Sequence, residues 1–299
     1  MRIEMATAPG SPQRPNEDHV FATAPAAGNG GVLVLLDGVT PPGGEYGCRH
    51  SVPWFTAHLG GALAELTGAR ADMTLADCLA EAIERTAARH SGTCDLSHPR
   101  TPQATVVCAR WDEERTEHLV LSDSVLLLET AGGAVEAVLD DRLSRLPEPI
   151  PSLRARMTAL PPGSPAREEL RREQAAAVEQ LRNAADGTGF YTAAADPSAA
   201  GYAVTGGRPR AQVRTLAAFS DGASRWSETF RLGGWPELLG LAREEGARAV
   251  ISRVREAEDA DPDGVRHRRG KRHDDASVVV AELEQVGGAG RGAGAQRPW

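Results

Sequence analysis

Short apolar runs separated by polar or glycine-containing turns dominate the pattern of this chain. Runs of this length, bounded by turn residues, are typical of β-strands. We predict strands at residues 19–23, 31–36, 104–111, 117–121, 125–129, 135–139, 213–219 and 276–283. The run 31–36 is apolar throughout, which predicts a strand that is buried on both faces. The short connections between residues 104 and 129 predict an antiparallel meander.

A period of three to four residues replaces this pattern in several longer segments and predicts helices. These segments are residues 49–66, 74–90, 166–183, 224–230, 235–245 and 247–257. Thr74, followed three residues later by Asp77, resembles a capping box at the start of one of them. The segment 143–165 is rich in proline and fits no regular element, so we expect a variable, mobile subdomain at about residues 142–205.

Composition sets the class of protein. The chain has 299 residues, of which 41% are hydrophobic, enough for one large α+β domain or two small ones. A net charge of −8 argues against a general nucleic-acid binder, because phosphate contacts need a positive face. No apolar run approaches the roughly 20 residues that span a bilayer, and no N-terminal segment resembles a signal peptide. We therefore expect a cytoplasmic protein with no nucleic-acid or membrane partner and leave the oligomeric state unknown.

The C-terminal end has a composition of its own. Residues 287–299 are mostly glycine and alanine, a composition that cannot bury a core. We expect a flexible tail there, after a single domain at residues 1–286.

The four cysteines show no obvious partnership in sequence. Cys48, Cys78, Cys94 and Cys108 are irregularly spaced, without a Cys-x-x-Cys pair or a nearby histidine pattern suitable for zinc. This usage favours a reducing compartment. His50 and His58 fall two turns apart on the predicted helix 49–66, and we interpret both as structural or surface residues.

Acidic residues recur at the ends of the strand-like runs. The positions are Asn16-Glu17-Asp18, Asp37-Gly38, Ser220-Asp221-Gly222 and Asp274-Asp275. Any one Asp-Gly pair is more often a turn than a ligand. Carboxylates collected from distant strand ends, however, are the ligands that Mg²⁺ and Mn²⁺ prefer, and a glycine lets the backbone approach a cation closely. Together they indicate metal-assisted hydrolysis.

The order of these segments resembles the metal-dependent protein phosphatases of type 2C. In that family the corresponding stretches are Asn-Glu-Asp, a strand to Asp-Gly, a Thr-Thr strand, Gly-Asp-Ser, Ser-Asp-Gly and Asp-Asn-x-Thr-Val-Val-Val. The matching stretches here are Asn16-Glu17-Asp18, Asp37-Gly38, Ala104-Thr105-Val106-Val107, Ser122-Asp123-Ser124, Ser220-Asp221-Gly222 and Asp274-Asp275-Ala276-Ser277-Val278. The likeness covers about residues 11–284.

The resemblance implies a fold and a reaction. The fold would be an α+β sandwich of two antiparallel sheets with helices on both outer faces. The reaction would be hydrolysis of phosphoserine or phosphothreonine in a protein substrate by a water between two Mn²⁺ or Mg²⁺ ions.

The resemblance also implies a ligand set. Asp37 would bridge the two ions, Glu17 and the carbonyl of Gly38 would hold one of them, and Asp221 with Asp274 would hold the other. Asp123 matches an aspartate that can help bind a third, weaker metal in bacterial members.

Two departures from the family pattern keep alternatives open. The family arginine that grips the substrate phosphate corresponds to Gln13, with Arg14 one residue nearer the glutamate. Either Arg14 reaches the phosphate through a shifted loop, or substrate binds more weakly. Val39 stands where some members have a general-acid histidine. The alternatives are a pseudophosphatase that binds without catalysis and a hydrolase of a small phosphorylated metabolite.

A basic run directly precedes Asp274. Residues 266–273 contain four arginines, two histidines and Lys271, which is the single lysine of the chain. The run could steer a phosphorylated substrate toward the site, or it could be a solvated loop.

Overall fold

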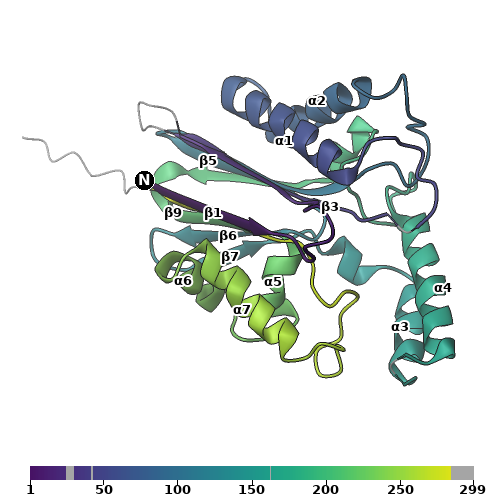
Figure 1. Cartoon of the computed structure of the whole chain (residues 1–299). Helices are drawn as coiled ribbons and strands as arrows, with labels where there is room; N and C mark the ends of the chain where they lie inside the picture. Colours follow the sequence, from purple (N-terminus) through teal and green to yellow (C-terminus); the bar gives the residue numbers. More distant parts are fainter. Residues whose placement is uncertain (25–29, 42, 162, 284–299) are drawn as a thin grey trace, which may run out of the picture.

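The computed structural model of the protein describes residues 1–24, 30–41, 43–161 and 163–283, and in it two β-sheets pack face to face (Figure 1). Each sheet has five strands, and all neighbouring strands are antiparallel. The first sheet has the order β1 (Arg2–Ala8), β10 (Ala276–Glu282), β9 (Val213–Phe219), β6 (Val125–Thr130) and β7 (Val135–Val138). The second sheet has the order β2 (His19–Thr23), β3 (Gly31–Gly38), β4 (Ala104–Trp111), β5 (Arg115–Leu121) and β8 (Val204–Pro209).

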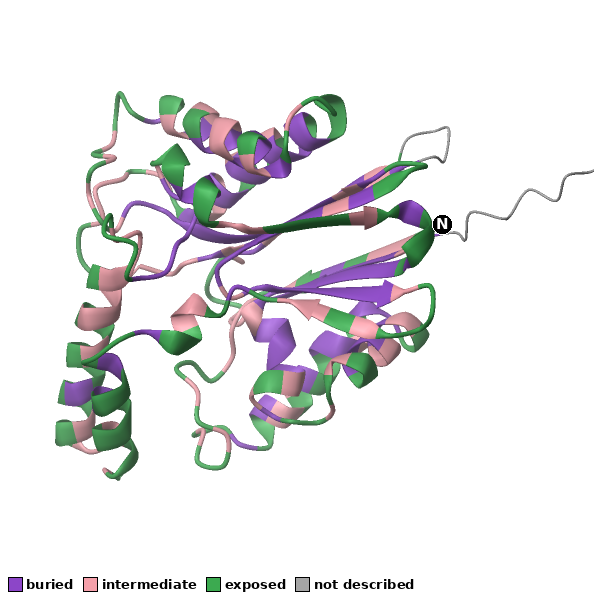
Figure 2. Cartoon of the chain, turned by 180° about the vertical axis from the view of Figure 1, so that it is seen from behind, coloured by how far each residue is buried: buried purple, intermediate pink, exposed green. Residues whose placement is uncertain are grey.

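Helices cover the outer face of both sheets (Figures 1 and 2). Over the second sheet lie α1 (Val52–Ala69) and α2 (Leu75–Ala88). Over the first sheet lie α5 (Asp221–Glu228), α6 (Trp235–Glu244) and α7 (Ala247–Asp259). The expected fold class, an α+β sandwich with helices on both outer faces, is confirmed.

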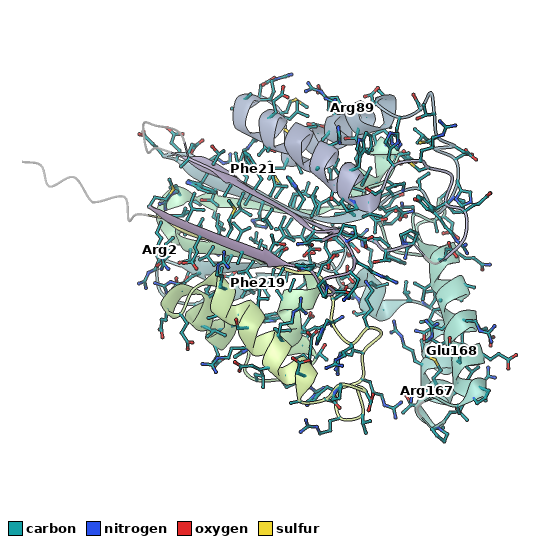
Figure 3. The ribbon with its side chains drawn as sticks, viewed as in Figure 1. Arg2, Phe21, Arg89, Arg167, Glu168 and Phe219 are labelled. Carbon is teal, nitrogen blue, oxygen red and sulfur yellow. The ribbon has the colours of Figure 1, made fainter. Side chains whose placement is uncertain are left out.

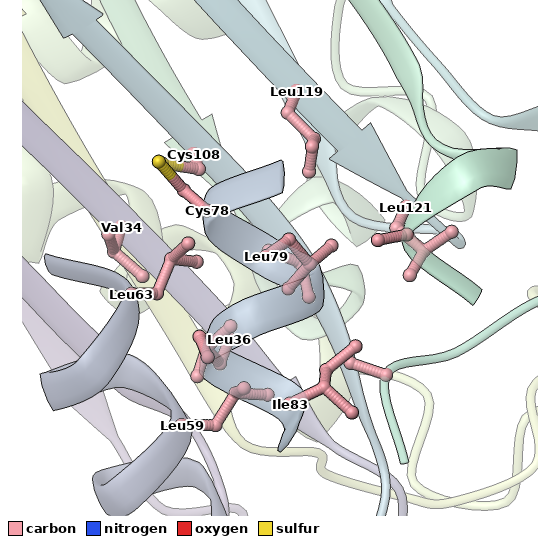
Figure 4. Packing of buried hydrophobic residues seen from close by; sticks show 14 of the residues in the cluster. Val34, Leu36, Leu59, Leu63, Cys78, Leu79, Ile83, Cys108, Leu119 and Leu121 are labelled. Atoms are coloured by element: carbon pink, nitrogen blue, oxygen red, sulfur yellow. The ribbon is translucent and has the colours of Figure 1, made fainter. Parts of the chain in front are cut away.

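Strand β3 shows how the apolar runs build this core. Leu33 and Leu35 point between the two sheets and belong to a buried apolar cluster there. Figure 3 shows side chains filling the space between the sheets. Val34 and Leu36 point the other way, and Figure 4 shows them beneath the leucines of α1 and α2. A strand with a helix layer on one face and a sheet on the other needs apolar residues at every position. Each fully buried leucine contributes about 2 kcal/mol of transfer free energy.

The helix boundaries follow from capping. Thr74 and Asp77 form the predicted capping box, and α2 begins at the next residue after Thr74. The prediction that a helix starts at residue 49 was wrong, because Ser51 caps α1 by accepting a hydrogen bond from the Trp54 N–H. His50 therefore lies in the loop before α1 and not on the helix.

The predicted meander was also wrong. Strands β4 and β5 pair in the second sheet, whereas β6 and β7 pair in the first. The chain crosses between the sheets at residues 122–124, where Ser122 has a φ of 70°. Local patterning cannot distinguish a tight hairpin from a short crossing, since both need a turn at the same place.

Two edge strands were missed in the sequence. Strand β1 mixes charged and apolar residues, and β8 contains two glycines and ends in proline. Edge strands carry weak hydrophobic patterns because one side of the strand has no neighbour to pack against. Their positions became evident only through pairing with β10 and β5.

The proline-rich segment is more regular than expected. It contains α3 (Ile150–Thr158), which packs against α4 (Pro165–Leu181) in a pair that projects from the side of the sandwich (Figure 1). Figure 3 shows Arg167 and Glu168 on α4, outside the sandwich. Pro151 and Pro165 sit in the first turns of these helices, where the missing N–H costs nothing, so the prolines start helices rather than prevent them. The predicted tail, residues 287–299, lies outside the described residues.

Short 3₁₀ turns complete the connections, at Asp141–Arg145, Pro197–Tyr202 and Arg210–Gln212. In the part of the chain that the structure describes, no helix is both long enough and apolar enough to cross a membrane.

Candidate metal centre

The acidic residues singled out in the sequence meet at one end of the sandwich. Asp37 is the penultimate residue of β3, and Glu17 lies just before its neighbour β2. Asp221 begins α5 directly after β9, and Asp274 precedes β10, which pairs with β9. Asp123 lies in the crossing between β5 and β6. Because the two sheets face each other, these strand ends form one rim.

Adjoining cavities open at this rim. One, of about 260 Å³, is lined by Asp37, Gly38, Asp123, Asp221 and Asp274, among others. The next, of about 320 Å³, shares Asp274 with the first and also reaches Glu17 and Arg14. The structure thus brings together every residue predicted for the site.

The carboxyl groups shift one another toward the protonated form. Burial, followed by the charges of Asp18 and Asp221, raises the pKa of Asp37 well above its usual value. Burial and the charge of Asp274 raise the pKa of Asp221 to about 6. Burial also raises the pKa of Glu17 and that of Asp123. Such a cluster of like charges is unfavourable without cations to offset it.

Asp18 supplies independent evidence that the donor set suits a cation. Both of its carboxyl oxygens are buried and have no hydrogen-bond partner in the described parts of the chain. Burial, together with the charges of Asp275 and Asp221, raises its pKa to about 7. Buried polar groups normally have partners, so these oxygens would suit hydrated ions, although the hydroxyls of Ser277 and Ser220 lie close enough to lower the Asp18 pKa. A rim of carboxylates with an open cavity fits hard divalent cations such as Mn²⁺ or Mg²⁺.

Close backbone approach explains the two glycines beside Asp37 and Asp221. A Cβ on Gly38 would stand 2.6 Å from the carbonyl oxygen of Glu17, and a Cβ on Gly222 would stand 1.9 Å from that of Asp275. Both distances are too short for any side chain. The glycines therefore let segments carrying different acidic residues pack directly against each other.

Asp275 was predicted only as a neighbour of Asp274, and the structure gives it a positioning role. Its carboxylate accepts hydrogen bonds from the N–H groups of Gly10, at 2.7 Å, and Glu17, at 2.6 Å. Thr40 in turn donates its hydroxyl to Oε2 of Glu17. These contacts orient the glutamate toward the cavity.

Two basic side chains hold Asp274, and the sequence identified neither of them as a site residue. Arg225, with an 8% exposed side chain, donates to Oδ2 at 2.8 Å and also pairs with buried Glu258 at 2.6 Å. Lys271, with a 48% exposed side chain, pairs with Oδ1 at 2.8 Å and donates to Thr40 at 3.0 Å. Burial lowers the pKa of Lys271, but the charge and hydrogen bond of Asp274 together with the charges of Asp221 and Asp37 outweigh burial and raise it. In the sequence, the only sign of these contacts was that the single lysine of the chain lies three residues before Asp274.

The remainder of the basic run is mostly paired within its own loop. Arg269 bonds Asp261, while Arg272 and His273 bond Asp259. Lys271 is the member of the run that pairs with a carboxylate of the acidic rim, while Arg272 and His273 line the cavity beside Glu17. The steering hypothesis therefore rests on these residues.

Two arginines face the cavities from opposite sides. Arg14 lines the cavity beside Glu17, whereas Gln13 accepts a hydrogen bond from Ser11 within its own loop. On the other side, Arg182, at the end of α4, lines the cavity with Asp123. Its Nε is buried without a hydrogen-bond partner among the described residues, and its guanidinium lies 5.5 Å from the Phe190 ring centroid. Sequence reasoning missed Arg182, because nothing local relates α4 to the rim.

Solved structures share this fold. The serine/threonine phosphatase Stp1 from Staphylococcus aureus is 14% identical, with a TM-score of 0.56 and 94% of each chain covered. The serine/threonine phosphatase PstP/Ppp from Mycobacterium tuberculosis is 16% identical, with a TM-score of 0.55, covering 95% of this chain and 98% of that one. The catalytic domain of PstP in complex with 2 manganese ions is 15% identical, with a TM-score of 0.52 and coverages of 94% and 97%.

These likenesses establish the fold: the chain is built like the bacterial serine/threonine phosphatases. No protein-family model matches the chain. No curated protein sequence matches it either. Any assignment of a reaction therefore depends on the residues of the rim.

Proposed function

We propose that this protein is a metal-dependent phosphatase that hydrolyses phosphoserine or phosphothreonine in proteins. The observation that carries the proposal is the convergence of Glu17, Asp37, Asp221 and Asp274 on adjoining cavities at one rim. The shared fold with bacterial serine/threonine phosphatases supports it, as does the manganese named with one of them.

Each acidic residue has a role in this proposal. Asp37 would bridge two Mn²⁺ or Mg²⁺ ions, Glu17 and the Gly38 carbonyl would hold one ion, and Asp221 with Asp274 would hold the other. Asp123 would serve a third, weaker site. Bound ions would supply an acidified water and positive charge to offset that of the phosphoryl group.

The remaining residues of the rim bind and orient. Asp18, with two unpartnered oxygens, is placed to accept hydrogen bonds from water in the cavity. Arg14 is placed to hold the phosphoryl oxygens on the Glu17 side, and Arg182 offers a second guanidinium on the Asp123 side. This arrangement would replace the family arginine, whose position is occupied here by Gln13.

The shape of the rim favours a polypeptide substrate over a small metabolite. A third cavity, of about 530 Å³, shares Asp123 and Asp221 with the central one and continues to Arg154 on α3. Together the cavities run from Arg14 across the acidic centre to the projecting helix pair. A phosphorylated chain can contact this whole length, whereas a small molecule would occupy only one cavity.

Metal-dependent turnover tests the proposal directly. We expect the purified chain to hydrolyse p-nitrophenyl phosphate and a phosphothreonine peptide at least about tenfold faster with Mn²⁺ than with a chelator. The rates are measured by released phosphate. An Asp72→Asn variant, changed at an exposed aspartate paired with Arg70, should match the wild type. Equal rates with Mn²⁺ and chelator would contradict the proposal.

A second candidate function rests on Lys271 and Arg225. Together they already pair with both carboxylate oxygens of Asp274. A chain that offsets its own acidic charge in this way could serve as a pseudophosphatase, a binding module that does not turn over substrate. For the phosphatase, Lys271 must release Oδ1 when an ion binds.

Mn²⁺ binding separates the two candidates, and removal of the lysine tests whether it competes with the ion. We expect Lys271→Met to tighten Mn²⁺ binding by up to about fivefold, since a half-exposed ion pair is worth about 1 kcal/mol at most. Isothermal titration calorimetry of wild type and variant measures the difference. Absence of Mn²⁺ binding in both proteins would support the binding module.

A further inference from the structure

The structure gathers two cysteines and two histidines away from the acidic rim. Cys48 and His50 lie in the loop between β3 and α1, while His90 and Cys94 lie just after α2. One donor atom from each of the four residues lies within 4.8 Å of all the others. The spacing of the cysteines and histidines along the sequence did not indicate this group. The reason is that the pairs come from segments some forty residues apart, which the packing of α2 against α1 brings together.

The distances from sulfur to nitrogen fit tetrahedral coordination. With Zn–S near 2.3 Å and Zn–N near 2.0 Å, tetrahedral coordination separates sulfur from nitrogen by roughly 3.5 Å. The Sγ of Cys48 lies 3.4 Å from Nδ1 of His90 and 3.7 Å from Nδ1 of His50. The Sγ of Cys94 lies 3.4 Å from Nδ1 of His50. All three separations match.

The two sulfurs are too far apart for a disulfide. Their separation is 3.1 Å, against about 2.05 Å for a covalent bond. Two thiolates on one zinc ion stand roughly 3.8 Å apart, so ion binding needs a movement of less than about 1 Å. A disulfide would also leave the convergence of both histidines on the same point without a cause.

The surroundings supply a backbone donor to each sulfur and fix one of the rings. The N–H of Arg49 donates to Sγ of Cys94, and the N–H of His50 donates to Sγ of Cys48, each at 3.4 Å. Such bonds would stabilise each thiolate once an ion had displaced its proton. The ring of His50 stacks on Trp54, with centroids 4.0 Å apart. This stacking fixes the ring plane before any ion arrives.

His90 supplies a second sign of a ligand. It is 2% exposed, and its Nε2 has no hydrogen-bond partner in the described part of the chain. Its Nδ1 is directed at a thiol, which is a weak partner for a buried imidazole. A metal bond at Nδ1 would replace this weak partner with a strong one, while Nε2 would keep its proton.

We propose that Cys48, His50, His90 and Cys94 form a structural site for one Zn²⁺ ion. Two thiolates and two imidazoles are soft and intermediate donors, which select zinc over the hard cations suited to the carboxylate rim. All four positions are filled by protein, so the site would be closed to substrate. The site is a separate feature from the acidic rim and does not depend on the proposed phosphatase activity.

The ion would fasten the loop that follows Asp37 and Gly38. That loop carries Thr40, which orients Glu17, and it is otherwise held to the segment after α2 by the bond from the Asp95 N–H to the Gly47 carbonyl at 2.7 Å. A four-coordinate cross-link between two such segments restricts both of them. Zinc would thus support the geometry of the rim from outside it.

Metal analysis of the full chain tests the site. The protein is purified under reducing conditions, dialysed against a mild chelator, and analysed for zinc by mass spectrometry. We expect about one zinc per chain in the wild type and equally in Asp37→Asn, which disables the acidic rim. Cys94→Ser and His90→Ala should retain less than about a tenth of this zinc. The matched controls Cys78→Ala and His58→Ala should retain it.

Cobalt substitution gives a readout that does not rely on a variant folding. Co²⁺ added to metal-free wild type should produce sulfur-to-cobalt charge-transfer absorption and intense visible bands of tetrahedral coordination. The same spectrum should appear in Asp37→Asn, because an oxygen-only rim gives no charge-transfer band from sulfur. Wild-type protein that holds no zinc and develops no such spectrum would overturn the proposal. So would a Cys48–Cys94 disulfide as the resting state under the same reducing conditions.

Discussion

Replacing Asp37 by asparagine should lower kcat/KM for phosphomonoester hydrolysis by at least about a thousandfold. The carboxylate lies at the centre of the rim, where the charges of Asp18, Asp221 and Asp123 act on it. An amide offers one neutral oxygen in place of two charged ones and cannot bridge two cations. The loss should fall mainly on kcat, and steady-state kinetics with p-nitrophenyl phosphate and Mn²⁺ measures it.

The same substitution should raise the thermal stability of the metal-free chain. Asp37 is surrounded by like charges, and removing its own charge relieves their repulsion. The asparagine oxygen can still accept the hydrogen bond that Asp37 receives from the Asp221 N–H at 3.2 Å. Differential scanning calorimetry in chelator should therefore show a higher Tm for the less active protein.

The opposite signs of the two effects make the prediction specific. A variant that lost activity through misfolding would lose stability as well. The control Asp72→Asn, at an exposed aspartate, should change neither quantity by much. If Asp37→Asn kept wild-type turnover with Mn²⁺, the bridging role assigned to Asp37 would be wrong.

The metal-free chain should lose stability as the pH rises from about 4 to about 7, by on the order of 3 kcal/mol. In the folded protein the pKa is raised to about 7 for Asp18 and to about 6 for Asp221, from 3.8. A raised pKa means that the folded state holds its protons more tightly than the unfolded state does. The contribution of these groups is complete below their unfolded pKa values and is lost as the pH passes the folded values.

Mn²⁺ should reverse this dependence. Ions bind the deprotonated carboxylates, so saturating Mn²⁺ should stabilise the chain more at pH 7 than at pH 5. Urea denaturation across this pH range, with chelator and with Mn²⁺, gives both curves. Asp18→Asn should flatten the metal-free curve. A metal-free chain whose stability rose steadily between pH 5 and 7 would contradict the assigned shifts.

The sequence predicted the elements near the site well for a physical reason. Strands such as β3 and β10 are buried on both faces, so nearly every position carries an apolar residue. Such a run can be recognised from the sequence alone. The capping box at Thr74 is equally local, since both partners lie within one turn. Elements whose identity depends on neighbours, such as β1 and β8, could not be found in this way.

The acidic residues of the rim were recognisable because their order along the chain is itself a pattern. Glu17, Asp37, Asp221 and Asp274 each stand at the end of a strand-like run, and antiparallel pairing brings such ends together. The residues that complete the rim were not recognisable. Lys271 looked like part of a charged loop, and Arg182 lies at the end of a helix with no local relation to the strands.

By itself the sequence determined which segments are buried strands and helices and which acidic residues end them, because these properties depend on near neighbours in the chain. Tertiary structure alone decided that β5 and β6 belong to different sheets and that Lys271 and Arg225 hold Asp274. It also decided that Cys48 and His50 meet His90 and Cys94. Contacts between distant segments depend on how helices and sheets pack. That packing is determined by residues throughout the chain and not by any one position.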